Sequence, residues 1–248
     1  MLKKTARSII NKLGYDVVKK LKKPDELPAD FEKATVDTYN MVKEYTMTSA
    51  ERIASLCNAV RYLVKNKIEG DIVECGVWRG GSTMAAIDTL IKVGDTAREI
   101  YLYDTFEGMS EPSELDKESF SGTSAAVLLK EYPDIKCVAT LEDVQNNVGN
   151  LKYPAELVHY VKGKVEETIP NTIPAKIALL RLDTDWFEST AHELEHLYPL
   201  LVPGGVIIID DYGHWEGARK AVDEYIAGNI LPLLLNRIDY TGRIGVKY

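Results

Sequence analysis

The stretch DIVECGVWRGGS, residues 71–82, joins a short apolar run to a glycine-rich turn and then to a segment with helical spacing. Runs of this kind are typical of strands buried on both faces of a parallel sheet. Four more follow along the chain: EIYLYD (99–104), ELVHYV (156–161), IALLRLD (177–183) and GVIIIDD (205–211). Helical patterns lie between and after them, at about 81–93, 123–132, 141–150, 187–201 and 215–228. The alternation of strands and helices predicts a doubly wound, mostly parallel α/β sheet.

Further elements flank this alternation. Thr48 and Glu51 form a capping-box pattern that predicts a helix to about residue 67. Two apolar stretches near the C-terminus, 231–238 and 242–248, predict a closing hairpin. We therefore expect an α/β domain over 48–248, preceded by an N-terminal extension over 1–47. The polar segment 107–122 predicts a long surface loop, and such loops often cover active sites.

Composition excludes several classes of protein. The chain has 248 residues, of which 45% are hydrophobic and 27% charged, and no apolar run reaches 18 residues. These values exclude a disordered chain, a collagen-like repeat and a membrane-spanning helix. The net charge of -8 argues against a nucleic-acid partner, because such binding needs an excess of basic residues. Three cysteines without CxxC spacing predict neither disulfides nor a thiolate zinc site, which favours a reducing cytoplasm.

The charge is unevenly distributed. Residues 1–23 carry eight basic side chains against Asp16 alone, and their apolar residues recur near helical spacing. A basic amphipathic helix of this kind packs on its own subunit, on a second copy in a homo-oligomer, or on a membrane surface. The sequence leaves these alternatives open.

Six carboxylates lie at the predicted strand ends. In a parallel sheet the ligand site lies beyond the carboxyl ends of the strands, so we expect these acids along one edge. They are Glu74, Asp104, Asp183, Asp185, Asp210 and Asp211. Glu74 needs a partner inside the fold, and the cationic end of a ligand is one candidate.

The first strand leads into a turn that favours a nucleoside-type cofactor. Its spacing is G-x-x-x-G-G rather than the dinucleotide pattern G-x-G-x-x-G. Gly76 lets the backbone approach a ligand closely, and Gly80 opens the next helix with its amides free. Asp104 ends the second strand, where an acid accepts hydrogen bonds from ribose hydroxyls. A purely structural turn with a strand-end cap is the alternative.

The acids of DTD (183–185) and DD (210–211) end two strands joined by a single helix. A right-handed crossover makes these strands neighbours, so four carboxylates are expected in one small volume. Their repulsion calls for protonation, solvent or a cation. Oxygen ligands favour a hard ion such as Mg²⁺, whereas ordinary helix N-caps are the alternative.

The segment HELEH, residues 192–196, matches the zinc motif HExxH. Its apolar positions share one helical face, and His192 and His196 lie opposite that face. We therefore predict a solvated helix face rather than a zinc site. His214, a lone histidine after the acidic doublet, is expected as a solvated loop side chain, with help in proton removal as the alternative.

Taken together, five ordered motifs resemble the macrocin O-methyltransferase family, which acts on sugars in antibiotic biosynthesis. The similarity runs from about Tyr45 to the C-terminus. It implies a class I, S-adenosylmethionine-dependent fold with a seven-stranded sheet and a divalent metal, usually Mg²⁺. The motifs are ECGVWRGGS (74–82), YDTFEGM (103–109), GKVEETIP (163–170), LRLDTDWFESTAHELEHLYPLLVPGG (180–205) and IIIDDYGHWEGARKAVDEY (207–225).

The resemblance also implies roles for individual residues. The loop on the methionine side of the cofactor matches Glu74, Gly76, Val77, Trp78, Arg79 and Gly80. Contacts to ribose and adenine match Asp104, Thr105, Phe106, Gly163 and Lys164. Thr46 and Met47 match residues that close over the cofactor. The metal ligands match Asp183, Asp210 and Asp211, and the general base matches Asp185.

The sequence departs from the family pattern at several positions. Cys75 stands where threonine is common, Thr184 replaces a glycine, and Lys164 sits where an aromatic residue is frequent. The segments 24–44 and 107–122 show little match, so the acceptor is not inherited. The expected function is metal-dependent O-methyl transfer to a small-molecule hydroxyl, of a sugar or glycosylated metabolite. A metal-dependent glycosyltransferase using the Asp-x-Asp, or a catalytically silent binding subunit, are the alternatives.

Overall fold

The computed structural model describes residues 27–248. The predicted basic helix over 1–23 lies outside the described residues. The chain divides into two units, Met1–Phe31 and Glu32–Tyr248, and the description below concerns the second.

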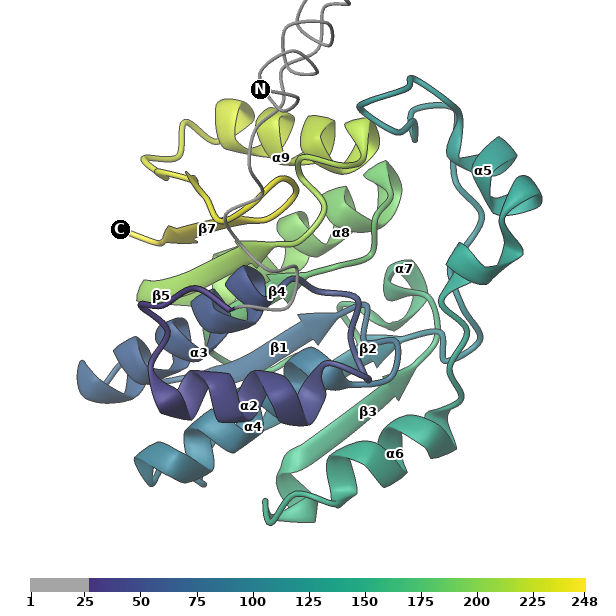
Figure 1. Cartoon of the computed structure of the whole chain (residues 1–248). Helices are drawn as coiled ribbons and strands as arrows, with labels where there is room; N and C mark the ends of the chain where they lie inside the picture. The colour runs from purple at the N-terminus through teal and green to yellow at the C-terminus, as the bar shows by residue number, and fades with distance from the viewer. Residues whose placement is uncertain (1–26) are drawn as a thin grey trace, which may run out of the picture. The chain divides into compact units, whose positions relative to one another are not determined.

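A seven-stranded sheet forms the centre of this unit (Figure 1). Its order is β3-β2-β1-β4-β5-β7-β6. The first five strands are parallel, whereas β7 pairs antiparallel with both β5 and β6. All five predicted parallel strands and the closing hairpin are confirmed. The strands are β1 (Asp71–Cys75), β2 (Ile100–Asp104), β3 (Val158–Lys162), β4 (Ile177–Leu182), β5 (Leu201–Ile209), β6 (Asn236–Arg237) and β7 (Arg243–Val246).

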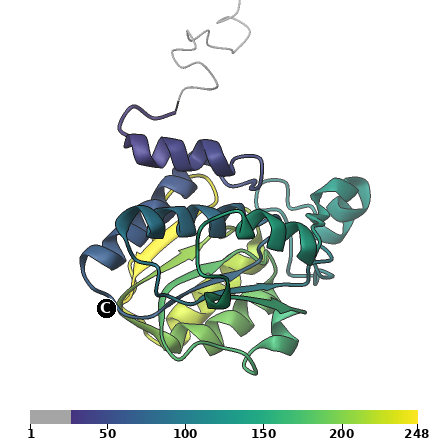
Figure 2. The same ribbon diagram turned by 90° about the horizontal axis from the view of Figure 1, so that it is seen from below.

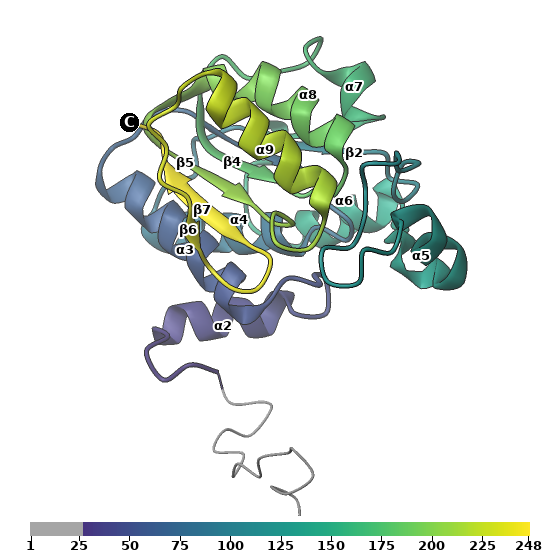
Figure 3. The same ribbon diagram turned by 90° about the horizontal axis from the view of Figure 1, so that it is seen from above.

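Helices cover both faces of the sheet (Figures 2 and 3). One face carries α3 (Ala50–Lys65), α4 (Gly81–Val93) and α6 (Leu141–Gly149), with α2 (Lys33–Val42) packed outside α3 and α4. The other carries α7 (Val165–Thr168), α8 (Phe187–Leu197) and α9 (Glu216–Gly228). Short 3-10 turns occupy Pro133–Lys136, Ala155–Leu157 and Tyr198–Leu200. Apolar residues of the strands pack into one core on each side, which is why the strand sequences are apolar throughout.

The structure differs from the sequence expectations near the N-terminal end of this unit. The polar stretch before residue 47 contains α2, whose Thr38 hydroxyl donates to Asp88 at 2.6 Å and accepts from Lys92 at 2.8 Å. Because this helix is anchored by polar contacts, apolar periodicity does not reveal it. The N-cap of α3 is Ser49, which accepts from the Arg52 backbone N–H, rather than Thr48.

Within residues 27–248, no helix combines the length and apolar character that crossing a membrane requires.

Candidate active site

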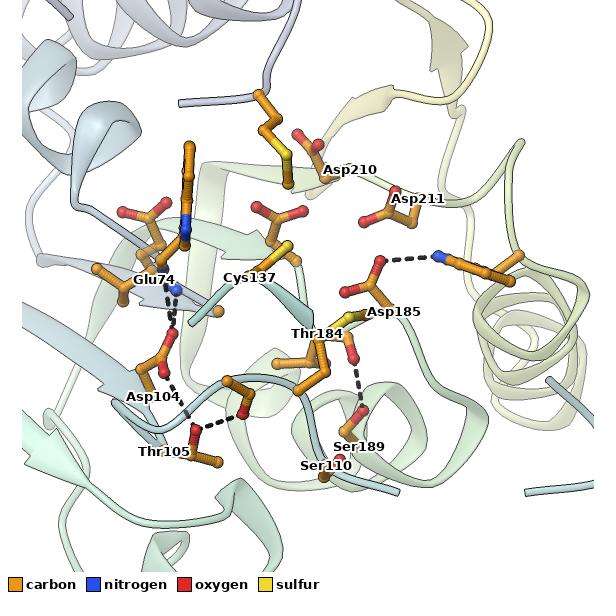
Figure 4. A pocket seen from close by; sticks show the side chains of 18 of the residues that line it. Glu74, Asp104, Thr105, Ser110, Cys137, Thr184, Asp185, Ser189, Asp210 and Asp211 are labelled. Carbon is orange, nitrogen blue, oxygen red and sulfur yellow. Dashed lines mark hydrogen bonds between the residues drawn. The ribbon is translucent and has the colours of Figure 1, made fainter. Parts of the chain in front are cut away.

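The carboxyl ends of the parallel strands open into a cavity of about 570 Å³. All six predicted strand-end carboxylates line it. Figure 4 shows Asp185, Asp210 and Asp211 gathered on one side, with Asp104 and Thr105 at the other. The sheet edge at which these six carboxylates were expected is therefore one continuous site.

Gly76 brings the ends of β1 and β4 into direct backbone contact. Its φ is +80°, and a Cβ atom built there would lie 2.0 Å from the carbonyl oxygen of Asp183. A side chain is excluded at this position for both reasons. The glycine of the first turn therefore sets the spacing between the turn and the acidic segment that follows β4.

Asp104 is held by backbone amides of the glycine-rich turn and of its own loop. Its Oδ2 accepts from the N–H groups of Val77 at 2.7 Å and Trp78 at 3.1 Å, and its Oδ1 accepts from Phe106 N–H at 2.6 Å. Both acceptor sites of Oδ2 are thus occupied, and Oδ1 keeps a further lone pair for a ligand. The turn and the acid are thus built as one unit at the end of β2.

Arg79 points away from the cavity. Its guanidinium donates to both carboxylate oxygens of Asp143, at 2.9 and 3.2 Å, and lies 5.0 Å from the centre of the Tyr45 ring. It therefore pairs with neither of the partners considered from sequence, Glu74 and the cofactor carboxylate. Together with the Gly81 N–H, which donates to Tyr45 O at 3.0 Å, it holds the segment 44–47 beside the turn.

The predicted cofactor contacts divide into two groups. Arg79, Gly80 and Phe106 do not line the cavity. Those that do are Thr46, Met47, Glu74, Gly76, Val77, Trp78, Asp104, Thr105, Gly163 and Lys164.

Asp183, Asp210 and Asp211 converge as the sequence predicts. Each offers a carboxylate oxygen, and these oxygens lie within 4.8 Å of one another. Burial raises the pKa of both Asp183 and Asp211 well above the usual range, and repulsion from neighbouring aspartates adds to the shift. A set of converging oxygen donors fits a hard divalent cation, because such a cation compensates both the burial of these carboxylates and their mutual repulsion.

Two arginines that the sequence analysis did not single out contact this cluster. Arg181 is buried on β4 and donates to Glu74 at 2.6 Å, to Asp183 at 2.7 Å and to Asp210 at 2.6 Å. Arg52 of α3 contacts Asp210 from the other side. Counting Asp185 as well, five carboxylates face two guanidiniums, which leaves an excess of negative charge when all are ionised.

Arg181 also supplies the buried partner that Glu74 needs. The second oxygen of Glu74 accepts from the Thr83 hydroxyl, so its contacts within the fold require no ligand. This pairing could have been anticipated from the arginine inside the apolar strand IALLRL, since a buried guanidinium requires acidic partners. Thr48 accepts from Arg181 at 3.1 Å, which explains why Ser49 caps α3 instead.

Asp185 lies beside this cluster on a tight turn. Its φ is +70°, a conformation in which aspartate and asparagine are tolerated better than most residues. Its Oδ1 accepts from the indole N–H of Trp215 at 2.8 Å (Figure 4). Burial, with a smaller contribution from Asp183, raises the pKa of Asp185 to about 8.

The loop after β2 forms one wall of the cavity. Met109 and Ser110 line it, together with Tyr132 after α5 (Ala125–Glu131). Cys137 also lines the cavity and lies between the two groups of acids (Figure 4). From its spacing in the sequence, this cysteine was expected in neither a disulfide nor a zinc site. Burial raises the pKa of its thiol to about 12, so it is a neutral wall residue.

The two histidine predictions need correction. His192 is half-buried and contacts the Ile169 carbonyl oxygen at 2.9 Å, so the HELEH face is not simply solvated. Glu193, between the histidines, is fully buried and accepts from Thr184 at 2.9 Å. His214 is half-buried and lines the cavity, and burial lowers its pKa.

The fold and the site together define a class I methyltransferase of the S-adenosylmethionine-dependent type. The family model described as macrocin O-methyltransferase matches residues 4–245, more of the chain than the motifs indicated. The chain belongs to the macrocin O-methyltransferase family and is an O-methyltransferase.

Individual relatives agree with this assignment. The chain is 35% identical to an 8-demethyl-8-(2,3-dimethoxy-alpha-L-rhamnosyl)-tetracenomycin-C 4'-O-methyltransferase of Streptomyces olivaceus, over 80% of this chain and 74% of that protein. It is 31% identical to the demethyldecarbamoylnovobiocin O-methyltransferase of Streptomyces niveus, over 74% and 68%. The structure of the O-methyltransferase NovP superposes with a TM-score of 0.72 at 29% identity and covers 82% of both chains.

Proposed function

We propose that this protein transfers the methyl group of S-adenosylmethionine to a hydroxyl of a sugar or glycosylated metabolite, in a reaction that requires a divalent cation. The observation that carries the proposal is that one cavity joins the glycine-rich turn and Asp104 to the cluster of Asp183, Asp210 and Asp211. A donor on the turn and an acceptor at the cluster would therefore share one space. The rhamnosyl group in the name of the Streptomyces olivaceus relative supports a sugar acceptor.

In this proposal the turn and Asp104 bind the donor. The backbone of Gly76 to Trp78 approaches the methionine portion closely, and Asp104 accepts hydrogen bonds from the ribose hydroxyls. Thr46 and Met47 cover the cofactor, with Arg79 holding their segment against the turn through Glu44 O and the Tyr45 ring. These contacts orient the methyl group toward the acidic side of the cavity, which makes the transfer effectively intramolecular.

The chemical step requires a proton acceptor. As the acceptor oxygen bonds to the methyl carbon, the carbon–sulfur bond breaks and its electron pair neutralises the sulfonium. The hydroxyl proton passes to Asp185, which acts as the general base. Asp183, Asp210 and Asp211 would hold a hard divalent cation such as Mg²⁺, which when bound supplies a Lewis acid that lowers the pKa of the hydroxyl.

A screen of acceptors tests the donor, the metal and the substrate class together. Purified full-length protein is incubated with S-adenosylmethionine carrying a labelled methyl group and a panel of p-nitrophenyl glycosides with vicinal hydroxyls, the α-L-rhamnoside among them. We expect labelled ether products that disappear with EDTA and return with excess Mg²⁺. Transfer that persists after complete chelation contradicts the metal requirement. Labelling of the nitrogen or carbon atoms of other acceptors, with no glycoside turned over, contradicts the substrate class.

A further inference from the structure

Trp215 connects the end of β5 to the carboxylate proposed as the base. It lies four residues after Asp211 and immediately before α9, and it is only 5% exposed. Its backbone N–H donates to Asp211 O at 3.1 Å, and its indole N–H donates to Asp185 Oδ1 at 2.8 Å (Figure 4). One residue thus joins the segments after β4 and β5 beside the acidic cluster.

Asp185 depends on this contact for its orientation. Within residues 27–248, the indole of Trp215 is the one N–H group that donates to the carboxylate of Asp185. The other side chain that hydrogen-bonds with it is Asp211, itself a carboxylate. The backbone of Asp185 turns sharply, with Trp186 N–H donating to Thr184 O at 2.8 Å. Without the indole, Asp185 would keep only its contact with Asp211, and Asp183 and Asp210 would repel it.

The indole is itself held rigidly. Its ring packs edge-to-face on Trp186, with ring centres 5.0 Å apart. The backbone on both sides of Trp215 pairs with the loop after β2, because Ser119 N–H donates to His214 O at 2.7 Å and Glu216 N–H donates to Lys117 O at 2.9 Å. The loop that forms the cavity wall therefore fixes the donor to Asp185 as well.

An indole suits this position chemically. It donates one hydrogen bond and accepts none, and it does not titrate in the pH range of proteins. It therefore occupies one oxygen of Asp185 without competing for the proton that the other oxygen would receive. Other enzymes that activate a hydroxyl also place a base next to it and orient that base with a third group.

We propose that Trp215 is a positioning residue that holds the carboxylate of Asp185 in place for proton removal from the acceptor. This inference rests on the proposed function, because it takes Asp185 as the base. Trp215 would act through Asp185 and would not itself bind the cofactor.

The kinetic test replaces Trp215 by phenylalanine, which keeps a buried ring and removes the N–H. We expect kcat to fall about 10- to 100-fold, the usual effect of a lost hydrogen bond to a charged group. The KM for S-adenosylmethionine and the Kd for S-adenosylhomocysteine should remain unchanged. Turnover is measured with the p-nitrophenyl glycoside of the panel that reacts fastest. Tyr153→Phe is the control, since it also removes one hydrogen-bond donor from a buried ring, here to Arg98 O at 2.7 Å and outside the cavity, and its kcat should stay near wild type.

A double-mutant cycle separates positioning from a general structural effect. In an Asp185→Ala background, Trp215→Phe should cause no further loss of kcat, because the group through which it acts is gone. An equal loss in both backgrounds, or an equal loss in Tyr153→Phe, overturns the inference. Full activity of Asp185→Ala instead refutes the role of Asp185 as base, so the failures of the two proposals are distinguishable.

A spectroscopic measurement does not depend on turnover. The chain has three tryptophans, so ¹⁵N-tryptophan labelling gives three indole signals, and the one lost in Trp215→Phe belongs to Trp215. We expect that signal to shift further in Asp185→Ala than the Trp186 signal, because the Trp186 indole N–H donates to Ser110 O and not to Asp185. Asp185→Asn, which suits the positive φ, serves as a second variant if the alanine variant does not fold. A Trp215 signal unchanged in both variants contradicts the contact.

Discussion

At the scale of single residues, the site depends on backbone conformations that few side chains tolerate. Gly76 and Asp185 both have positive φ, and they lie at the ends of adjacent strands, β1 and β4. Gly76 is required because the Asp183 carbonyl occupies the space of a Cβ atom. Asp185 has a positive φ, and its carboxylate accepts the hydrogen bond from the Trp215 indole. Local strain of this kind is often found where geometry matters for function.

We predict that Gly76→Ala destabilises the protein by about 2–4 kcal/mol, because it combines backbone strain with a steric clash. Gly94 offers a matched control, since it has the same φ of +80° but nothing within 4 Å of its Cβ position. Gly94→Ala should cost only the conformational part, about 1 kcal/mol. Urea denaturation of both variants measures the difference. Equal losses in the two variants would show that the close approach to Asp183 has no energetic weight.

Asp185→Asn should lower kcat by a factor of about 100–10,000 through loss of the general base. Asparagine tolerates the positive φ of this position and can still accept from the Trp215 indole, so the fold should persist. Calorimetric titration with S-adenosylhomocysteine should give an unchanged Kd. A variant that turns over at the wild-type rate would remove Asp185 from this role.

At the scale of elements, the loop after β2 is docked by a buried carboxylate. Asp116 is fully buried, and its Oδ1 accepts from Phe187 N–H at the start of α8 at 2.8 Å. Its Oδ2 accepts from the backbone N–H of Ser113 at 2.7 Å and from the hydroxyl at 2.8 Å. Gly217 of α9 leaves room for this carboxylate, because a Cβ there would lie 1.9 Å from Asp116 Oδ1. The loop is thus joined to both helices that follow the acidic strand ends.

Asp116→Ala should lower the free energy of unfolding by about 2–3 kcal/mol, since it removes a helix cap and leaves buried N–H groups without acceptors. We also expect the KM for the acceptor to rise more in this variant than the KM for S-adenosylmethionine. Glu114→Ala, at an exposed position of the same loop, should change stability by no more than about 0.5 kcal/mol. Urea denaturation and separate KM determinations check both effects. A rise confined to the KM for S-adenosylmethionine would contradict this role of the loop.

At the scale of the whole molecule, excess negative charge at the strand ends opposes folding. A divalent cation that binds the folded state relieves this repulsion and adds binding free energy. At a concentration of 100 times Kd, one bound ion contributes about 2.7 kcal/mol, or roughly 5–10 °C in Tm for a chain of this size.

We therefore expect Mg²⁺ to raise the Tm of the wild-type protein measured by calorimetry after EDTA treatment. Asp211→Asn should lose this response, and its Tm without Mg²⁺ should be above that of the wild type, because the cost of burying an ionisable carboxyl beside other aspartates is gone. A Tm that is insensitive to Mg²⁺ in the wild type, or equal shifts in both proteins, would contradict binding at the cluster.

Much of this architecture is predictable from local sequence. The boundaries of α4 match the predicted 81–93 because glycines stand at both ends of the helical pattern. The order of β4 and β5 follows from the single-helix crossover, so the convergence of the DTD and DD acids was predictable too. The helix α2 was not predictable from local sequence, since Thr38 and its polar partners on α4 help to hold it in place.

The amino-acid sequence alone determined the α/β alternation, the glycine-rich turn and the edge on which six acids lie, because strand periodicity and chain order are local properties. The tertiary structure alone decided which groups hold these acids. Arg181 neutralises part of the cluster, Arg79 turns to Asp143, and Trp215 reaches Asp185. Such pairings join residues far apart in the chain, and a side chain selects its partner by distance and desolvation in the folded state, which no local pattern encodes.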